Sequence, residues 1–303
     1  MATLYWKTEK KRVPLRARSL LGRHPECHVR VDSAKVSGEH AGLYWVDGGW
    51  ELRDLGSRNG TYVDGRRLAA GERVVLKQGG IFSLSRSAAI FEVVDASPPA
   101  AIATHKESGV AHIADGGVLA LPNEQQLRAT LFSTSSGLWQ IEMDSHVRPV
   151  MDREIITLGD SSYVLEVPAQ HTETLESGAI GVPIESIGLR FAVAPDEEQV
   201  EVTLLMGGQT KRLEPREYHY LLVTLARARL ADAHAPPSMQ GWTDRDELSK
   251  KLNIEVNRMN VAIFRARKQL AALGVQGAAR LVERRSGTHE IRIGVPRLEV
   301  VKL

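Results

Sequence analysis

The sequence has one cysteine, Cys27, among its 303 residues, so no disulfide can form within the chain and a reducing compartment suits it. No apolar run comes close to the roughly 20 residues that a membrane-spanning helix needs. The first 22 residues contain no apolar signal-peptide core. We therefore expect a cytoplasmic protein with no membrane partner.

Enzymatic motifs are also missing. The sequence contains no phosphate-binding P-loop, no nucleophile elbow and no kinase motif set, which disfavours an enzyme. His24, Cys27 and His28 are grouped in HPECH as metal ligands often are, but no second ligand pair with zinc-site spacing follows. We expect no catalytic residue, no metal ion and no cofactor.

Charge of both signs is present, but it is distributed unevenly. Residues 1–97 carry 16 basic and 11 acidic side chains, residues 98–195 carry 5 and 12, and residues 196–303 carry 18 and 14, so the net charges are +5, −7 and +4. Two basic ends flank an acidic middle, which suggests anionic partners at both ends. The length allows two or three domains with cores of their own.

Residues 1–97 have the pattern of an antiparallel β-sandwich. Short runs of strand composition, such as GLYWVD and AAIFEVVD, alternate with turn signals such as Asp64–Gly65. Three of the intervening loops carry four polar side chains: Arg23, Ser37, Arg58 and Asn59. Loops at one end of a sandwich can converge on a ligand, and arginine, hydroxyl and amide groups together suit a phosphate attached to a peptide.

These residues resemble a known family. Gly22–Arg23, then VSGEH with Ser37 and His40, then WELRDLGSRNGTYVDG are similar in order and spacing to the motifs of forkhead-associated (FHA) domains, which bind phosphothreonine peptides. The resemblance covers residues 1–97. It implies that Arg23 and Ser37 hold the phosphate, that Asn59 holds the peptide backbone, and that Arg58 contacts the residue after the phosphothreonine. For His40 it implies a structural role in tying a loop.

The acidic middle, residues 98–181, begins at SPPA and has the composition of short β-strands, but it lacks the three loop motifs of the first part. The run from WQIEMD to SSYVLEV weakly echoes the run from WELRDL to AAIFEVV, either as a degraded repeat or by coincidence. We expect a spacer or docking module. Residues 170–181 resemble an exposed linker, in which Thr172 and Thr174 are candidate phosphorylation sites.

Residues 186–303 begin with two strand-like runs, LRFAVA and EVTLLMGGQTKRL, and then change to helical periodicity. In the first predicted helix, Pro215 lies in the first turn. One face of that helix is apolar and carries Tyr218, Leu221, Leu222 and Leu225. A second helix is predicted after Thr243 as N-cap, with Asp246 at the capping-box position.

A third helix is predicted over EVNRMNVAIFRARKQLAAL. Its apolar stripe recurs every three or four residues and consists of Val256, Met259, Ile263, Ala266, Leu270 and Leu273. The opposite face carries Asn257, Arg258, Val261, Arg265 and Lys268. The hairpin RLVERRSGTHEIRI follows, and residues 255–292 carry 8 basic and 3 acidic side chains, a net of +5. Two short helices, a basic third helix and a hairpin are the layout of a winged helix-turn-helix that inserts its third helix into the major groove.

This segment also resembles a family, the winged-helix output domains of response regulators (OmpR/PhoB type). LEPREYHYLLVTL is similar to their first helix, VAIFRARKQL to their recognition helix and RRSGTHEIRI to their wing, and the similarity covers residues 186–295. It implies double-stranded DNA as a partner, with Arg258, Val261, Arg265 and Lys268 facing DNA and Arg284, Arg285 and Thr288 on the wing. The sequence departs from the family at Glu214, where a capping Ser or Thr is usual, and in the long APPSMQG loop.

Together these features predict a multidomain α+β protein. An FHA-like β-sandwich over 1–97, a β-rich middle over 98–181 and a winged helix over 186–303 would make a phosphothreonine-dependent transcriptional regulator. Its phosphorylated partner would be a Ser/Thr kinase or a kinase substrate. Phosphopeptide binding could shift homodimerisation, release the winged helix or recruit the protein to a kinase. The alternative is a phosphorylation-dependent scaffold whose winged helix contacts protein.

Overall fold

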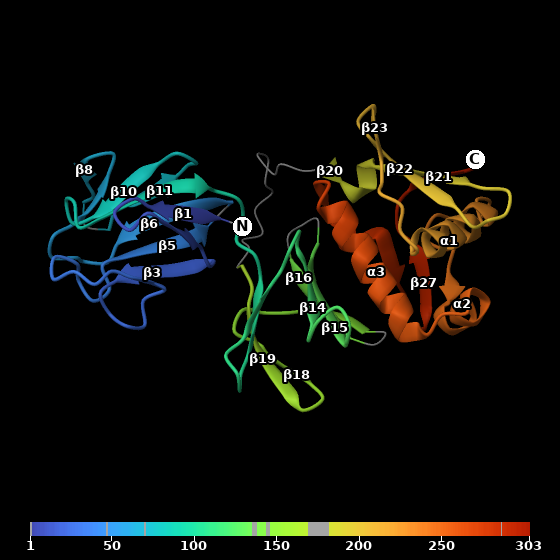
Figure 1. The fold of residues 1–303 in the computed structure, drawn as a ribbon, viewed down its shortest axis with the longest axis horizontal. Coiled ribbons are helices and arrows are strands. Elements are labelled where there is room, and N and C mark those ends of the chain that lie inside the picture. The colour runs from blue at the N-terminus through green and yellow to red at the C-terminus, as the bar shows by residue number, and fades with distance from the viewer. Residues whose placement is uncertain are drawn as a thin grey trace. The chain divides into compact units, whose positions relative to one another are not determined.

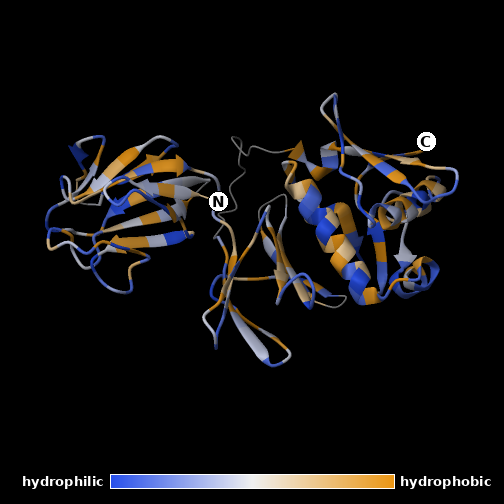
Figure 2. Cartoon of the chain, in the orientation of Figure 1, coloured by the Kyte–Doolittle hydropathy of each residue, from blue (hydrophilic) through white to orange (hydrophobic). Residues whose placement is uncertain are grey.

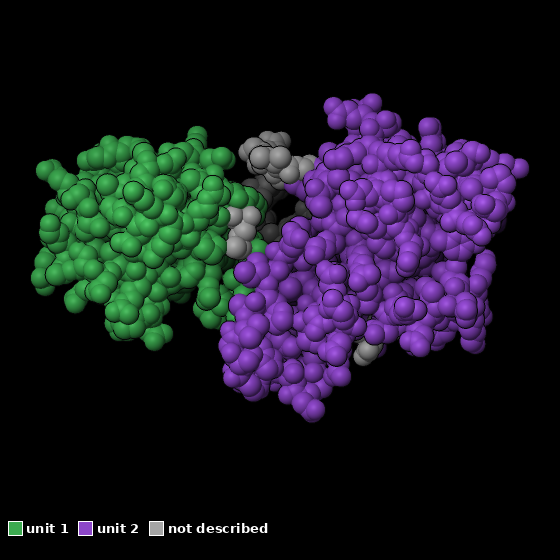
Figure 3. All heavy atoms as spheres, in the orientation of Figure 1, with its two compact units in different colours: residues 1–104, 152–154, 164–177 green, residues 105–151, 155–163, 178–303 purple. Residues whose placement is uncertain are grey.

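The computed structural model describes residues 2–46, 48–69, 71–134, 138–143, 146–168, 182–285 and 287–303. The chain divides into two compact units (Figures 1 and 3). Unit 1 consists of residues 1–104, 152–154 and 164–177, and unit 2 of residues 105–151, 155–163 and 178–303. The predicted linker at 170–181, with Thr172 and Thr174, lies outside the described residues.

Unit 1 contains a sandwich of two sheets, antiparallel except for the parallel pair β3–β4. One sheet has the order β2-β1-β11-β10-β7-β8 and the other β4-β3-β5-β6-β9. The strands are β1 Thr3–Trp6, β2 Lys11–Pro14, β3 Arg18–Gly22, β4 Val29–Arg30, β5 Ala41–Val46, β6 Gly49–Asp54, β7 Thr61–Val63, β8 Arg66–Arg67, β9 Arg73–Leu76, β10 Ile81–Leu84 and β11 Ala89–Asp95. Along β11 buried positions alternate with partly buried ones, and its buried Phe91 stacks on Phe82 in the core. The predicted β-rich N-terminal part is confirmed.

The middle segment forms two four-stranded sheets, β13-β12-β19-β18 and β14-β15-β16-β17. The strands are β12 Ile102–His105, β13 Ala111–Ile113, β14 Val118–Leu121, β15 Ala129–Ser133, β16 Trp139–Met143, β17 His146–Pro149, β18 Ile155–Leu158 and β19 Ser161–Glu166. Taken in chain order, these strands repeat the arrangement of β2-β1-β11-β10 and β3-β5-β6-β9 in the first sandwich. The strands without a counterpart are β4, β7 and β8, and β4 and β7 adjoin the loops that hold Arg23, Ser37 and Asn59. The middle segment therefore repeats the frame of the first sandwich without those loops.

The C-terminal part combines a sheet in the order β23-β22-β21-β28 with three helices and a small sheet in the order β24-β27-β26. Its elements are β20 Val182–Pro183, β21 Gly188–Val193, β22 Val200–Met206, β23 Gln209–Arg212, α1 His219–Ala231, β24 Thr243–Asp244, α2 Arg245–Leu252, α3 Val256–Ala271, β25 Val275–Gln276, β26 Val282–Arg284, β27 Glu290–Ile293 and β28 Arg297–Lys302, with short 3₁₀ turns at Ile184–Ser186 and Ala278–Leu281. Among the described residues, no helix is both long and apolar enough to cross a membrane.

The three predicted helices are present, but two of their starts differ from the prediction. Helix α1 begins at His219, so Pro215 lies in the preceding turn and not in the helix. The N-cap of α2 is Asp244, whose carboxylate accepts hydrogen bonds from the backbone N–H groups of Asp246 and Glu247 at 2.9 and 3.0 Å. The cap therefore lies one residue after the predicted Thr243, which pairs with Ile291 in β24.

The apolar stripe predicted for α3 faces the core. Met259, Ile263, Ala266 and Leu270 are all buried, and Figure 2 shows hydrophobic and hydrophilic residues alternating along the turns of this helix. The core around them is completed by β21, β22 and α1, for example by Phe191, Val202 and Leu225. The opposite side of α3 is therefore the side that can meet another molecule or another part of the chain.

Candidate functional site

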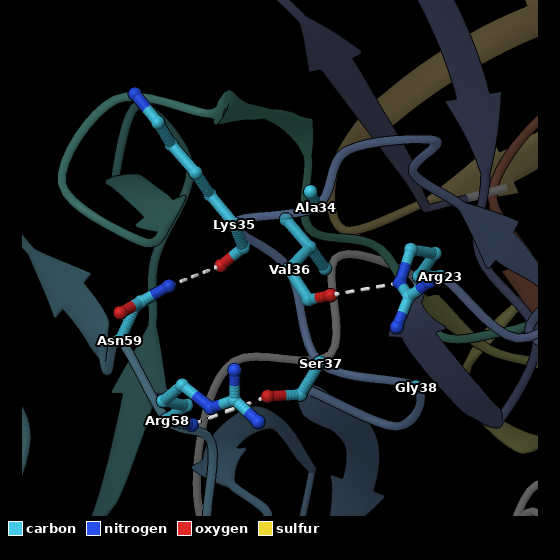
Figure 4. Close-up of a pocket in the computed structure, with 8 residues that line it drawn as sticks. All are labelled: Arg23, Ala34, Lys35, Val36, Ser37, Gly38, Arg58 and Asn59. Carbon is cyan, nitrogen blue, oxygen red and sulfur yellow. Dashed lines mark hydrogen bonds between the residues drawn. The ribbon is translucent and has the colours of Figure 1, made fainter.

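Three loops at one end of the unit 1 sandwich surround a small polar cavity (Figure 4). Its volume is about 190 Å³, and its lining consists of Arg23, Ala34, Lys35, Val36, Ser37, Gly38, Arg58 and Asn59. Arg23 follows β3, residues 34–38 lie between β4 and β5, and Arg58 and Asn59 lie between β6 and β7. The four residues predicted to bind a phosphopeptide thus line one cavity.

The position of Arg23 depends on a close approach of two backbones at Gly22. A Cβ atom on Gly22 would lie 2.0 Å from the carbonyl oxygen of Gly38, so only glycine fits. The contact lets Arg23 N donate to Ser37 O and His24 N donate to Gly38 O, both at 2.9 Å. Arg23 and Ser37 are therefore held side by side by their own backbones.

His40 connects two of the three loops. It is fully buried, its Nδ1 accepts a hydrogen bond from Ser37 N at 3.1 Å, and its Nε2 lies 3.1 Å from Gly60 O. Accepting at Nδ1 and donating at Nε2 requires the neutral imidazole. Burial lowers the pKa of His40, which keeps it in that form although Gly60 O and Asp54 act in the opposite direction. This geometry gives His40 the loop-tying role predicted for it.

Asp54, at the end of β6, organises the third loop. Its carboxylate accepts hydrogen bonds from Gly56 N, Ser57 N, Ser57 Oγ and Thr61 Oγ1 at 2.7 to 2.9 Å. Burial acts to raise the pKa of Asp54, but these hydrogen bonds outweigh it and lower the pKa below its usual value. Sequence reasoning did not single out Asp54; the signal for it was an aspartate two residues before the Gly56–Ser57 turn.

Further hydrogen bonds fix the side chains at the cavity (Figure 4). Arg58 N donates to Ser37 Oγ at 3.1 Å, which joins the third loop to the second. Asn59 Nδ2 donates to Lys35 O at 2.7 Å, and Arg23 Nε donates to Val36 O at 3.4 Å. The Asn59 amide is therefore oriented toward the rim of the cavity by the backbone of the chain itself.

The charge of the lining favours an anion. Arg23, Lys35 and Arg58 are all exposed cations, and none of the eight lining residues is acidic. Because these three side chains are exposed, a ligand can reach the cavity from solvent without opening of the sandwich. A cavity of this size, polar and cationic, fits a phosphate or a similar small anionic group.

Residues 20–85 match the FHA domain model. The chain carries an FHA domain. The oxoglutarate dehydrogenase inhibitor of Corynebacterium diphtheriae is 49% identical over 43 residues, and that of Corynebacterium glutamicum is 46% identical over 43 residues. Each match covers 14% of this chain and only 30% of the relative's length.

Solved structures are also similar over the FHA domain. A structure titled as Mycobacterium tuberculosis EmbR in complex with a low-affinity phosphopeptide is 26% identical, with 32% of this chain and 25% of that chain covered and a TM-score of 0.29. A structure from an analysis of phosphothreonine-dependent FHA domain interactions is 22% identical, with 30% of this chain and 93% of that chain covered and a TM-score of 0.27.

Three side chains of HPECH make hydrogen bonds within the FHA domain: His24, Cys27 and His28. Cys27 Sγ donates to Gly38 O at 3.2 Å, His28 Nδ1 lies 2.9 Å from Ser19 Oγ, and His24 Nδ1 accepts from Glu26 N at 3.3 Å. Burial, with a smaller effect of Arg16, lowers the pKa of His28 to about 4. Within the described ranges, His, Cys, Asp and Glu side chains form no group of three or more that could hold a metal ion.

Four of the residues predicted to face DNA contact the middle segment of the same unit. Val261 packs against an apolar cluster that includes Val118 and Phe132. Arg265 lies 3.6 Å from Glu124 Oε2, and Lys268 lies 3.1 Å from Glu124 Oε1. Arg284 is not on an exposed wing: only 4% of its side chain is exposed, and it lies 2.8 Å from Glu142 Oε1.

The other four predicted DNA-facing residues lie away from these contacts. Asn257 and Arg258 are exposed in the first turn of α3. Arg285 pairs with Glu290 at 2.9 Å and lies over the ring of Trp242. The Thr288 hydroxyl donates to Arg285 O at 3.2 Å in the turn between β26 and β27.

Proposed function

We propose that this protein is a non-catalytic, phosphothreonine-dependent transcriptional regulator. The observation that carries the proposal is the cavity in the FHA domain, where Arg23, Ser37, Arg58 and Asn59 meet from three loops. The FHA domain binds a partner protein that carries phosphothreonine. Residues 186–303 act as a winged helix that binds double-stranded DNA.

In the proposed complex, Arg23 and the Ser37 hydroxyl donate hydrogen bonds to phosphate oxygens. The Ser37 oxygen already accepts from Arg58 N, so its own O–H is the donor left for a ligand. Asn59 lies beside them, where an amide can bond to the backbone of a bound peptide. Charge-assisted hydrogen bonds of this kind are about twice as strong as neutral ones, so phosphate supplies much of the affinity.

The element order of the C-terminal part supports the DNA-binding half of the proposal. Helices α1, α2 and α3 are followed by the hairpin β26–β27, and β24 joins that hairpin to form a small sheet. The exposed Asn257 and Arg258 begin α3, where a recognition helix presents side chains to base edges.

Binding of phosphothreonine peptides to the whole chain tests the FHA part. We expect Arg23→Ala to weaken binding about 30-fold or more, because one charge-assisted contact to phosphate contributes about 1.5–3 kcal/mol and Arg23 can make two. The matched control is Arg12→Ala, which removes an exposed arginine on β2 that does not line the cavity. Equal losses in both variants, or binding of the unphosphorylated peptide, would contradict the assignment.

A scaffold that recruits proteins and not DNA is the second candidate. The contacts of Val261, Arg265, Lys268 and Arg284 with the middle segment favour it, because this face of α3 already serves as a protein-binding surface. The relatives named as oxoglutarate dehydrogenase inhibitors agree with a protein target. The two candidates differ in DNA binding that weakens steeply as salt rises, which only the regulator requires.

A further inference from the structure

Helix α3 lies on the outer face of the sheet β14-β15-β16. All four residues of β14 are buried. Because alternate residues of a strand point to opposite faces, both faces of this sheet are covered at β14. Val118 pairs in register with Phe132, which places both on one face, and Ala120 lies on the same face two residues along β14. These three side chains share one apolar cluster with Phe264 and Ala279.

The middle segment and α3 approach each other closely at the C-terminal end of the helix. A Cβ atom on Gly116 would lie 2.7 Å from the Cβ atom of Ala271. Such a distance is shorter than real Cβ contacts, so the backbone of the middle segment touches the helix directly at this point. The middle segment and α3 are therefore packed like parts of one core and not merely tethered.

A buried ionic cluster lies beside the apolar one. Glu142, on β16, accepts a hydrogen bond from Arg267 Nη2 at 3.0 Å and lies 2.8 Å from Arg284 Nη2. The three side chains are 7%, 3% and 4% exposed. Arg267 Nη2 also donates to Val282 O, and Arg284 Nη2 donates to Asn260 Oδ1, so the two guanidinium groups are fixed on the helix and the hairpin.

Two more carboxylates of the middle segment meet cations of α3 nearer the solvent. Glu124 lies between Arg265 and Lys268, and Asp115 lies 3.7 Å from Lys268. Altogether three carboxylates of the middle segment neutralise cations of α3 and β26. A DNA backbone would place its phosphates against cations of this same face.

We infer that the middle segment is an intramolecular cover that competes with DNA for α3. The inference rests on the proposed DNA-binding function. The carboxylates of Asp115, Glu124 and Glu142 take the places of DNA phosphates, and the apolar cluster holds them there. DNA and the middle segment cannot bind Val261, Arg265 and Lys268 at the same time, so the chain binds DNA through this face only after the cover has left it.

The competition gives a function to the middle segment, which repeats the frame of the first sandwich without its three ligand loops. It has the frame of the FHA domain but lacks β4, β7 and β8. Its loop after β14, which follows the counterpart of β3, carries Glu124, and this carboxylate meets Lys268 of α3. The FHA domain thus presents cations to an anionic ligand, and the middle segment presents carboxylates to the cationic helix α3.

The first test compares Glu142→Gln with wild type in the full chain. The isosteric substitution leaves Arg267 and Arg284 buried without a counter-charge, which opposes the closed contact. We expect binding of a fluorescent mixed-sequence 30-base-pair duplex at low salt to tighten at least about tenfold. Asp160→Asn is the matched control, because it neutralises an exposed carboxylate of the same segment in the turn between β18 and β19.

The second test uses a disulfide to lock the middle segment onto α3 reversibly. In a Cys27→Ser background, Gly116→Cys with Ala271→Cys places two thiols at this close contact, where a shift of about 1 Å gives disulfide geometry. We expect the oxidised protein to bind the duplex at least about tenfold more weakly than its reduced form. Each single-cysteine variant should bind equally in both conditions.

The single variant Ala271→Cys also reports opening by its rate of thiol labelling. Faster labelling together with tighter DNA binding in Glu142→Gln supports the cover. Equal DNA binding by the oxidised and reduced double-cysteine protein overturns the cover and leaves the DNA-binding function standing. Faster labelling in Glu142→Gln without DNA binding by any variant overturns both.

Discussion

Glu142 and Arg267 are 125 residues apart in sequence, yet their side chains are joined at 3.0 Å and are almost completely buried. Burial acts to raise the pKa of Glu142, but Arg267 and Arg284 outweigh it, so the pKa lies below its usual value and the carboxylate is ionised. One anion thus pairs with two cations, and the N–H groups at Nε of both arginines are buried without a hydrogen-bond acceptor among the described residues. The cluster specifies how the middle segment docks on α3 at a cost in desolvation.

This balance predicts that removing one member of the cluster lowers the free energy of unfolding much more than replacing all three members does. Glu142→Gln should lower the free energy of unfolding by about 3–5 kcal/mol, because two buried cations lose the carboxylate that each pairs with. Replacing Glu142, Arg267 and Arg284 together by methionine should be neutral or stabilising, because no charge is then buried. Urea unfolding followed by far-ultraviolet circular dichroism measures both. A triple variant as unstable as the single one would show that the ionic cluster itself stabilises the contact.

The docking of the middle segment could not be predicted from the sequence. The strand composition of β14–β16, the stripe of α3 and the basic outer face were all visible. The pairing of Glu124 with Lys268 or of Glu142 with Arg284 was not, because no local pattern links residues so far apart. Two signals were nevertheless present. The run VLAL in β14 does not alternate, and Phe264 lies outside the apolar stripe of α3, so both needed a second partner.

The cavity at the end of the first sandwich was predictable for the opposite reason. Arg23, Ser37, Arg58 and Asn59 are spaced in the loops of a sandwich whose frame brings such loops together, so a linear motif sufficed. Sequence alone predicted the support from His40 but left out Asp54, whose four hydrogen bonds depend on the shape of the third loop. It also placed the N-cap of α2 on Thr243, whereas the cap is Asp244; both residue types are good N-caps, so the local sequence did not decide between these neighbours.

The close approach at Gly22 yields a paired prediction. Gly22→Ala should destabilise the FHA domain by about 1–3 kcal/mol and weaken phosphopeptide binding, because the new Cβ displaces the Gly38 carbonyl and with it Ser37. Gly38→Ala is the control for stability from the same contact: a Cβ there has nothing within 4 Å, so the free energy of unfolding should barely change. Thermal unfolding and peptide titration compare the two. Equal effects would show that the backbone contact does not set the site.

His28 predicts a loss of stability in acid. Its pKa falls from 6.5 to about 4 on folding, so the unfolded chain binds the proton more tightly. Stability is unaffected by His28 above pH 6.5 and declines as pH falls from 6.5 toward 4, by about 3 kcal/mol in all at 1.36 kcal/mol per pH unit. Urea unfolding between pH 7.5 and 4.5 should show a flatter profile for His28→Gln than for wild type. Parallel profiles would mean that His28 is protonated equally in both states.

Asp54 is the positioning residue of the third loop. Its removal should change the shape of this loop without changing the charge of the cavity lining. Asp54→Ala leaves Arg23, Ser37, Arg58 and Asn59 in place chemically but removes four hydrogen bonds that hold the loop. We expect phosphopeptide affinity to fall about tenfold and stability by about 2–4 kcal/mol, since the acceptor is charged. Asp54→Asn keeps one acceptor oxygen for the backbone N–H groups and should recover part of both. Isothermal titration with wild-type affinity for Asp54→Ala would show that a bound peptide can order the loop without this carboxylate.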